Sequence, residues 1–472
     1  MSGNINTSRM LKTAPEDRLP MSKKLLYGLG GVSFKLGRDS MNQLVNPVFN
    51  IIMGLNPLLI GFVMMGARLW DAITDPLMGT ISDNSESKYG RRRPYIVLGA
   101  IASGVTFPLI WYANSDWGQG MLIAYFIVTA LLFWTAFTIF SVPYESLGYE
   151  LTPDYHERTR IFGIRLCVNQ VATLLIPWLF AIAQWDGFSN DMTGIRVVGT
   201  VVGVLLMISG ILPGVFMVER YRNLAQGQAK RTLKDAILVP LRNRPFMIIA
   251  AIVLMFFIGS ITMEALGIYV NIYYMSGGDT KAGAYLQGLF GTVVAVSSFG
   301  GGILVGFLGS RFGKIRVLQG MILLALVASL LKWFLFDPDA PYLQLIIAAM
   351  NGMATVSFWA LTFSMKADIC DYDEWQSGMR REGIYGAGAA YIHKLATSIT
   401  YLIAGGVLVF TGFQQELGGG QSEETLFLLR LSFTLGPVAF FILCLFLLRF
   451  YPITDDKMME IRGELEARRN AV

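Results

Sequence analysis

Charged residues, histidine and cysteine are all scarce in this sequence. Of its 472 residues, 15% are charged and 54% are hydrophobic, whereas soluble proteins carry about 25% charged residues. The three cysteines and the two histidines, His156 and His393, stand at unrelated spacings, which suggests neither a disulfide framework nor a zinc motif. The GxSxG, HExxH and Walker motifs are absent as well. We therefore expect neither an enzyme with catalytic residues nor a bound cofactor.

Apolar runs long enough to cross a bilayer recur along the whole chain. The predicted spans cover residues 27–52, 58–82, 94–114, 120–147, 160–184, 195–217, 245–274, 281–308, 315–336, 341–367, 385–411 and 427–450. This pattern predicts an all-α polytopic membrane protein with twelve transmembrane helices.

Basic residues are concentrated in every second loop between the predicted spans. Loops after even-numbered spans carry clusters such as Arg91–Arg93, whereas loops after odd-numbered spans hold single residues such as Arg196. The positive-inside rule therefore predicts that both termini are cytoplasmic. Residues 1–24 lack the apolar region of a cleavable signal peptide. We expect a multi-pass, monomeric protein of the cell (inner) membrane that contacts lipid; the net charge of +5 follows from this topology and does not indicate a nucleic-acid partner.

The longest predicted cytoplasmic connector divides the chain into two sets of six spans. The predicted parts are a cytoplasmic segment 1–24, a six-helix bundle 25–218, a connector 219–244, a second bundle 245–451 and a cytoplasmic tail 452–472. A weak repeat supports duplication, since Gly79-TISDNSESKYGRRR follows span 2 and Val305-GFLGSRFGKIR follows span 8. We expect the charged end of the tail to be a solvated helix.

Two aspartates, Asp71 and Asp75, lie inside the second predicted span. An acid in the membrane costs roughly 2.5–3.5 kcal/mol on insertion scales, so its presence indicates function. Four residues apart, both project from one face of a helix. Pro76 leaves the carbonyl of Ala72 without its helical donor. These oxygens suit a proton or a small hard cation such as Na⁺; the alternative is a structural pair bridged to other helices.

Other polar residues lie inside spans 1, 4, 5, 10 and 11. Asp39, beside Arg38, could accept hydrogen bonds from substrate hydroxyls or pair with a basic residue. Further candidates are Thr138, Ser141 and Glu145 in span 4, Arg165 in span 5, Trp359 in span 10, and His393 and Lys394 in span 11. These spans can converge on a central cavity between the halves. Acids, bases, hydroxyls and a tryptophan together suit a polyhydroxylated ligand.

Five motifs in order carry a family resemblance. They are Gly37-RDS, Arg68-LWDAITDPLMGTISD with Arg91-RRPYI, Val142-PYESLGYELTPDYHERT, Arg165, and Ala367-DICDYDEWQSGMRREG followed by Lys394. With them the sequence resembles the glycoside–pentoside–hexuronide:cation symporters, the melibiose permease group of the major facilitator superfamily. The resemblance implies a fold of two six-helix halves and symport of a glycoside with Na⁺ or H⁺ by alternating access.

The resemblance also implies roles for individual residues. It implies a cation site made by Asp71, Asp75, Thr138 and Thr74. It implies substrate ligands at Asp39, Arg165 and Trp359, with Arg38 adjacent, and a lysine at Lys394 that couples the cation and sugar sites. It implies a cytoplasmic gate in which Asp368, Asp371 and Arg381 close against the loops after spans 2 and 4.

Two positions depart from the melibiose permease pattern. Ser141 stands where those proteins have an aspartate that binds galactoside hydroxyls, and Glu145 stands in place of a stacking tryptophan. We therefore expect a neutral or acidic glycoside other than melibiose. Arg38, Arg165, His393 and Lys394 suit an acidic sugar such as a glucuronide, and the space left by the missing ring suits a larger neutral glycoside equally well. The alternatives are a carrier of lysophospholipids or other amphiphiles, a drug/H⁺ antiporter, and a non-transporting sensor.

Overall fold

Helices make up all of the regular structure that can be described. The computed structural model describes residues 17–85, 87–152, 154–219, 239–379 and 381–470, and every regular element in these ranges is a helix. Eleven segments in them are long and apolar enough to cross a membrane. The first predicted span is not among the eleven; it forms α1 (Met21–Val45), whose charged residues lower its hydropathy, and the π-helix η2 (Asn46–Ile52). An all-α membrane protein is thus confirmed, and the count of twelve spans stays a prediction.

The chain forms two compact units. The first consists of Met1–Leu55 and Trp70–Gln228, and the second of Asn56–Leu69 and Ala229–Val472. The structure groups Asn56–Leu69 with the second unit, and the predicted bundles 25–218 and 245–451 stay a prediction. Helix α2 (Pro57–Asp83) therefore contributes its first part to the second unit.

Glycine explains why the start of α2 packs with the second unit. A Cβ atom added to Gly61 would lie 2.7 Å from the carbonyl oxygen of Tyr401, and one added to Gly405 would lie 2.4 Å from that of Pro57. Small residues let two helix backbones approach this closely in membrane proteins. The sequence has 50 glycines, so the abundance of glycine alone does not predict this contact.

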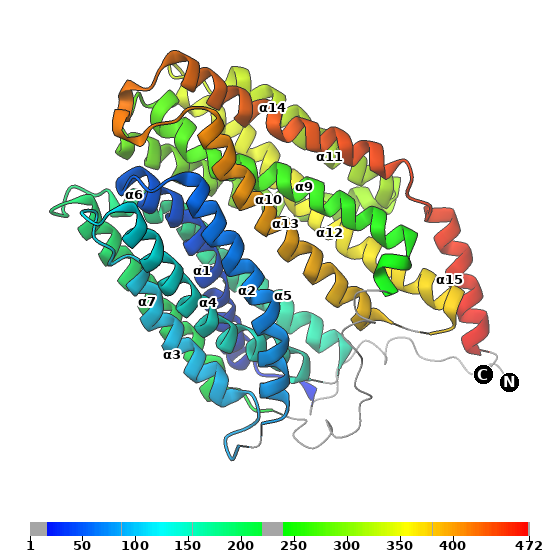
Figure 1. Cartoon of the computed structure of the whole chain (residues 1–472). Helices are drawn as coiled ribbons and strands as arrows, with labels where there is room; N and C mark the ends of the chain where they lie inside the picture. Colours follow the sequence, from blue (N-terminus) through cyan, green and yellow to red (C-terminus); the bar gives the residue numbers. More distant parts are fainter. Residues whose placement is uncertain (1–16, 86, 153, 220–238, 380, 471–472) are drawn as a thin grey trace. The chain divides into compact units, whose positions relative to one another are not determined.

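In the first unit, α1 and α3 each pack against two other long helices. Besides α1, η2 and the end of α2, it contains α3 (Arg93–Ile110), α4 (Gln119–Glu150), α5 (Tyr155–Leu175), η3 (Ile176–Trp178), α6 (Leu179–Ala183) and α7 (Asp191–Phe216). Helix α3 packs against α4 and α7, and α1 packs against α5 and α7 (Figure 1).

The second unit repeats this pattern of packing. It contains α9 (Arg244–Tyr269), η4 (Val270–Met275), α10 (Thr280–Phe312), α11 (Lys314–Leu335), η5 (Pro341–Leu343), α12 (Gln344–Ser377), α13 (Glu382–Phe410), η6 (Gln415–Gly420), α14 (Glu423–Leu448) and α15 (Asp455–Asn470). Helix α11 packs against α12 and α14, and α9 against α13 and α14. The helices α11, α12 and α14 correspond to predicted spans 9, 10 and 12. They pack in the same pairs as α3, α4 and α7, which correspond to predicted spans 3, 4 and 6.

A second repeated feature marks the first span of each half. Helix α1 continues into the π-helix η2, and α9 continues into the π-helix η4. Each π-helix holds a buried asparagine, Asn50 or Asn271, whose amide nitrogen donates a hydrogen bond of 2.8 Å. These matched elements support the internal duplication suggested by the weak sequence repeat.

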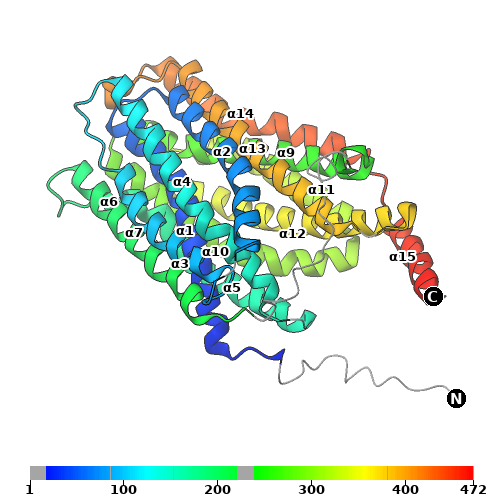
Figure 2. The ribbon, with the colours of Figure 1, turned by 60° about the horizontal axis from the view of Figure 1, so that its bottom comes forward.

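The final helix, α15, packs against the end of α12 in the second unit (Figure 2). Its residues Met458, Ile461 and Leu465 are buried in the hydrophobic core of that unit. Their spacing of three and four residues places them on one face of the helix. The expectation of a solvated helix is therefore wrong, because the charged residues that suggested it occupy only the other faces.

Candidate functional site

The predicted cation residues lie on α2 and α4, where the two helices are joined by side chains. The Thr138 hydroxyl donates a hydrogen bond of 3.0 Å to Oδ1 of Asp75. Farther along the same pair of helices, the Trp70 indole nitrogen donates one of 2.9 Å to the Thr135 hydroxyl. Asp71 is buried, with 6% of its surface exposed. The sequence prediction that Thr138 lies beside Asp75 thus has a counterpart in the geometry, although a bound cation remains a prediction.

Thr74 and Pro76 shape the backbone beside these acids. The Thr74 hydroxyl donates to the carbonyl of Trp70 at 3.1 Å, and its oxygen can still accept a hydrogen bond or ligate a cation. Pro76 lies inside α2 and removes one helical donor. In the described ranges, no cluster of three or more His, Cys, Asp or Glu side chains could hold a metal. Two carboxylates with hydroxyl oxygens suit a hard monovalent ion or a proton rather than a transition metal.

In α1, Asp39 lies within a small cluster of charges. The Lys35 ammonium lies 2.5 Å from Oδ2 of Asp39, and Nε of Arg38 lies 3.6 Å from Oδ1. The sequence left open whether Asp39 pairs with a basic residue, and the structure shows that it does. Lys35 was missed, although its spacing of four residues from Asp39 is the usual one for an ion pair on a helix.

Arg165 and Glu145 meet where α5 packs near α4. Nη2 of Arg165 lies 3.2 Å from Oε1 of Glu145. The guanidinium also lies 5.0 Å from the ring centre of Tyr144 and 5.3 Å from that of Phe34. Ser141, one turn before Glu145 on α4, is buried. Three of the predicted substrate residues therefore occupy one region of the first unit.

In the second unit, an aromatic cluster contains Trp359 and His393. Their ring centres lie 5.7 Å apart, and Phe257 of α9 lies 5.5 Å from Trp359 and 4.7 Å from His393. Lys394 follows His393 on α13. Phe257 was missed, because one phenylalanine in a helix rich in apolar residues carries no distinguishing signal.

The predicted gate residues separate into two groups. Asp368 accepts hydrogen bonds from Lys314 and from Arg462 of α15, the latter at 2.9 Å, and Arg462 also lies 3.6 Å from Asp371. Arg381 instead pairs with Asp373 through two hydrogen bonds of 2.8 and 2.6 Å. The structure therefore shows Arg381 in contact with Asp373, and the gate of Asp368, Asp371 and Arg381 stays a prediction.

The turn that joins α12 to α13 explains the contact between Arg381 and Asp373. It returns the chain past the last turn of α12, so Arg381 meets Asp373, eight residues earlier. The hydrogen bonds that Arg381 donates to the Asp373 carboxylate raise the pKa of Arg381 above its ordinary value. Sequence reasoning missed Lys314, Asp373 and Arg462 because their contacts depend on tertiary packing, including that of α15.

The basic loop after span 2 is held by carboxylates of the first unit. Arg91 and Arg92 lie 2.7 and 2.9 Å from Oε1 of Glu150. The Glu219 carboxylate accepts backbone hydrogen bonds of 2.8, 2.8 and 3.1 Å from Arg91, Arg92 and Arg93 at the start of α3. A negative charge is favourable at that end of a helix dipole. The arginines of the motif that suggested duplication are therefore held by ion pairs and backbone hydrogen bonds to Glu150 and Glu219.

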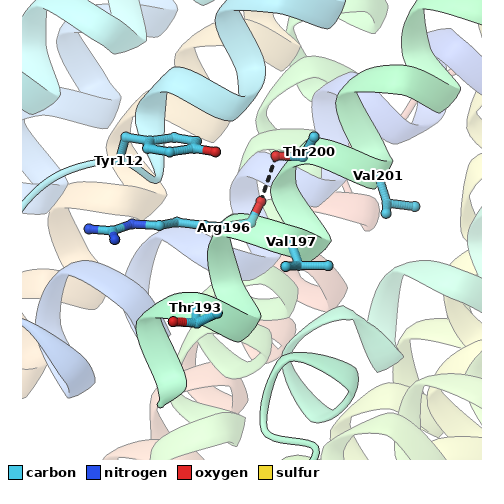
Figure 3. Close-up of a pocket in the computed structure, with 6 residues that line it drawn as sticks. All are labelled: Tyr112, Thr193, Arg196, Val197, Thr200 and Val201. Atoms are coloured by element: carbon cyan, nitrogen blue, oxygen red, sulfur yellow. Dashed lines mark hydrogen bonds between the residues drawn. The ribbon is translucent and has the colours of Figure 1, made fainter. Parts of the chain in front are cut away.

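A surface pocket of about 440 Å³ lies elsewhere on the first unit, between the end of α3 and the start of α7 (Figure 3). The Arg196 guanidinium lies 5.5 Å from the ring centre of Tyr112, and Thr200 donates to the carbonyl of Arg196 at 2.7 Å. The lining residues are Tyr112, Thr193, Arg196, Val197, Thr200 and Val201. None of them is a predicted site residue, so this pocket is separate from the candidate site.

Membrane-spanning helices, a repeated helix pairing and acids within the spans define a membrane transporter rather than an enzyme. The profile of the family described as "MFS/sugar transport protein" matches residues 26–455. The chain belongs to this family, which confirms the resemblance to glycoside–pentoside–hexuronide:cation symporters of the major facilitator superfamily.

Relatives and a solved structure agree with this assignment. The chain is 23% identical to the glucuronide carrier protein homolog of Escherichia coli (strain K12), over 94% of this chain and 95% of that protein. It is also 23% identical to the isoprimeverose transporter of Lactiplantibacillus pentosus, over 97% and 94%. The sodium-dependent lysophosphatidylcholine symporter 1 of Mus musculus is 22% identical over 96% and 90%. A crystal structure of a D-xylose-proton symporter matches the fold, with a TM-score of 0.62, 17% identity and coverage of 92% and 98%.

Proposed function

We propose that this protein is a cation-coupled symporter that carries a glycoside, an oligosaccharide or a hexuronide across the cell's inner membrane by alternating access. The observation that carries the proposal is the hydrogen bond between Thr138 and Asp75, next to the buried Asp71, in the helices where the family resemblance implies a cation site. The names of the relatives from E. coli and L. pentosus support a sugar as the substrate.

Coupling between the cation and the substrate follows from the free-energy cost of two ionised acids inside the protein. Asp71 and Asp75 stand one helical turn apart, so their charges repel each other and both resist removal from water. A bound Na⁺ or proton relieves both penalties and lets the loaded transporter change state. If the cation raises substrate affinity by some factor, the substrate raises cation affinity by the same factor. We propose Asp71, Asp75, Thr138 and Thr74 as the cation site.

The substrate ligands are proposed from both units. Asp39, Arg165 and Glu145 belong to the first unit, and Trp359 and Lys394 belong to the second. The mouse relative acts on a lysophospholipid, but the ion pairs at Asp39 and Arg165 favour a ligand rich in hydroxyl groups over an amphiphile. The positive-inside pattern supports cytoplasmic termini.

Uptake into proteoliposomes tests the proposal. Purified protein is reconstituted, and accumulation of a panel of labelled glycosides and uronides is measured with an imposed Na⁺ gradient, an imposed pH gradient, or neither. We expect accumulation above equilibrium for at least one sugar under one of the two gradients. Equal uptake with and without both gradients would contradict coupling, and accumulation of lysophospholipids alone would favour the amphiphile carrier.

A further inference from the structure

The pair formed by Glu145 and Arg165 has unequal exposure. The Arg165 side chain is 10% exposed, whereas the Glu145 side chain beside it is 46% exposed. The two are joined by one contact of 3.2 Å between Nη2 and Oε1. A ligand that reaches this arginine therefore approaches it next to a carboxylate.

Aromatic rings cover the guanidinium of Arg165. The ring centres of Tyr144, Phe34 and Phe162 lie 5.0, 5.3 and 5.9 Å from its central carbon. Tyr144 is itself fixed, since its hydroxyl donates to the carbonyl of Tyr27 at 2.8 Å and its ring stacks on that of Tyr27 at 4.9 Å. Stacking fixes the plane of a guanidinium, and its hydrogen-bond donors all lie in that plane. Arg165 is therefore a fixed set of donors with Glu145 as the adjacent acceptor.

The charges of the proposed site residues in the first unit are nearly balanced. The positive groups are Lys35, Arg38 and Arg165, and the negative groups are Asp39, Asp71, Asp75 and Glu145. Three positive and four negative charges give a net charge of −1 before a cation binds, and of zero with one bound. These seven residues, which are the charged proposed site residues of the first unit and Lys35 beside Asp39, therefore contribute no surplus positive charge to balance a carboxylate on the substrate.

We propose that Glu145 and Arg165 determine specificity by recognising a pair of neighbouring hydroxyl groups on a neutral glycoside, and that Glu145 disfavours uronates. One hydroxyl accepts a hydrogen bond from Arg165, and its neighbour donates one to Glu145. This inference rests on the proposed symport function and selects the neutral class among its substrates.

A carboxylate on the sugar meets two penalties at this pair. It lies close to the negative charge of Glu145, and like charges in a poorly solvated site repel each other strongly. It also cannot donate a hydrogen bond to Glu145, whereas a hydroxyl can both donate and accept. At Arg165 it also meets a guanidinium that already contacts one carboxylate, through Nη2 at 3.2 Å.

A matched pair of sugars tests the proposal: 4-nitrophenyl β-glucoside and 4-nitrophenyl β-glucuronide, which differ only in a hydroxymethyl or carboxylate group. Their inhibition constants are measured in competition with a transported glycoside in proteoliposomes. We expect the wild type to bind the glucoside at least about tenfold more tightly, a difference of about 1.4 kcal/mol. Glu145→Gln, which keeps the size and removes the charge, should shift the ratio of the two constants by about tenfold or more toward the glucuronide.

Two control variants accompany the test. Glu145→Asp keeps the negative charge and should keep the preference for the glucoside. Glu150→Gln removes another arginine-paired acid from the same helix and should leave the ratio of the constants unchanged, whatever it does to the rate.

The outcomes separate the inference from the function on which it rests. A wild type that prefers the glucuronide, or a Glu145→Gln variant with an unchanged ratio, would overturn the inference while symport stands. If no glycoside or uronide is accumulated under either gradient, the proposed function itself fails. The ratio of the two inhibition constants in the wild type tests the inference even if Glu145→Gln does not fold.

Discussion

The two units share one pattern of helix packing but use different chemistry where the corresponding helix pairs α3–α7 and α11–α14 meet. In the first unit, Pro108 leaves the carbonyl of Gly104 without its helical donor, and Gly203 of α7 packs so closely that an added Cβ would lie 2.5 Å from that oxygen. In the second unit, Pro437 leaves the carbonyl of Phe433 without its donor, and the buried Lys332 of α11 donates to it at 3.0 Å. The comparison teaches that a duplicated scaffold keeps its helix pairs while its polar groups diverge.

The same divergence affects the proposed transport residues. The acids proposed for the cation, Asp71 and Asp75, both come from the first unit. The second unit contributes the aromatic cluster around Trp359 and His393, with Lys394 next to it. Under the proposed function, the first unit would therefore supply the cation site and hydroxyl ligands, and the second an aromatic surface and a base.

The largest expected effect comes from removing the acids that only the first unit supplies. Asp71→Asn or Asp75→Asn should abolish accumulation driven by a cation gradient, because a neutral amide cannot balance the charge of the bound cation. The protein should remain folded, and downhill exchange of substrate can survive. Uptake into proteoliposomes with and without the gradient measures this, and wild-type accumulation in the double variant would remove the proposed role.

The next effect concerns the charged substrate ligands of the first unit. Asp39→Ala and Arg165→Ala should each eliminate measurable substrate binding, since a charge-assisted hydrogen bond contributes about 1.5–3 kcal/mol and its loss leaves partners unsatisfied. Equilibrium binding of a labelled substrate to purified protein is the measurement. Unchanged affinity in both variants would place the substrate elsewhere.

The buried lysine of the second unit should matter for stability rather than for coupling. Lys332→Met leaves the Phe433 carbonyl without a donor in the core, which should lower the free energy of unfolding by about 1–3 kcal/mol. Adding Pro437→Ala restores a backbone N–H for that carbonyl and should recover part of the loss. Thermal unfolding of the purified variants measures both effects, and a double variant no more stable than Lys332→Met would contradict this explanation.

The smallest effect compares two threonines on corresponding helices. Thr138 of α4 donates to Asp75, whereas Thr362 of α12 donates to backbone carbonyls of its own helix. Thr138→Val should weaken the apparent cation affinity by about three- to tenfold, in line with one hydrogen bond of about 1 kcal/mol. Thr362→Val is the matched control and should leave the apparent cation affinity near the wild-type value. Equal shifts in both variants would show that the effect is not specific to the cation site.

Local spacing carried most of what the sequence could predict. The positions of Asp71, Asp75 and Thr138 follow from helical periodicity and from motifs, and the family follows from motif order. Contacts between distant segments could not be derived, because no local pattern encodes them. Arg462 reaches Asp368 only because α15 packs on α12, and Lys332 reaches Phe433 only because α11 packs on α14.

The packing of the start of α2 with the second unit could not be derived from the sequence for a similar reason. The segment Asn56–Leu69 is continuous with Asp71 in one helix, so the sequence offers no boundary there. It joins the second unit through the close glycine contacts at Gly61 and Gly405. Such contacts depend on which small residues face each other in space, and glycine is spread through most of the spans.

Linkage between cation and substrate is the most direct test of the central claim. Substrate affinity is measured by equilibrium binding to purified wild-type protein at low and high Na⁺, and separately across pH, with Asp71→Asn as the comparison. We predict that one of the two cations raises the affinity of the wild type for its sugar, that the sugar raises the affinity for that cation by the same factor, and that Asp71→Asn abolishes both effects. Sugar affinity in the wild type that is independent of both Na⁺ and pH would contradict cation-coupled symport through Asp71 and Asp75.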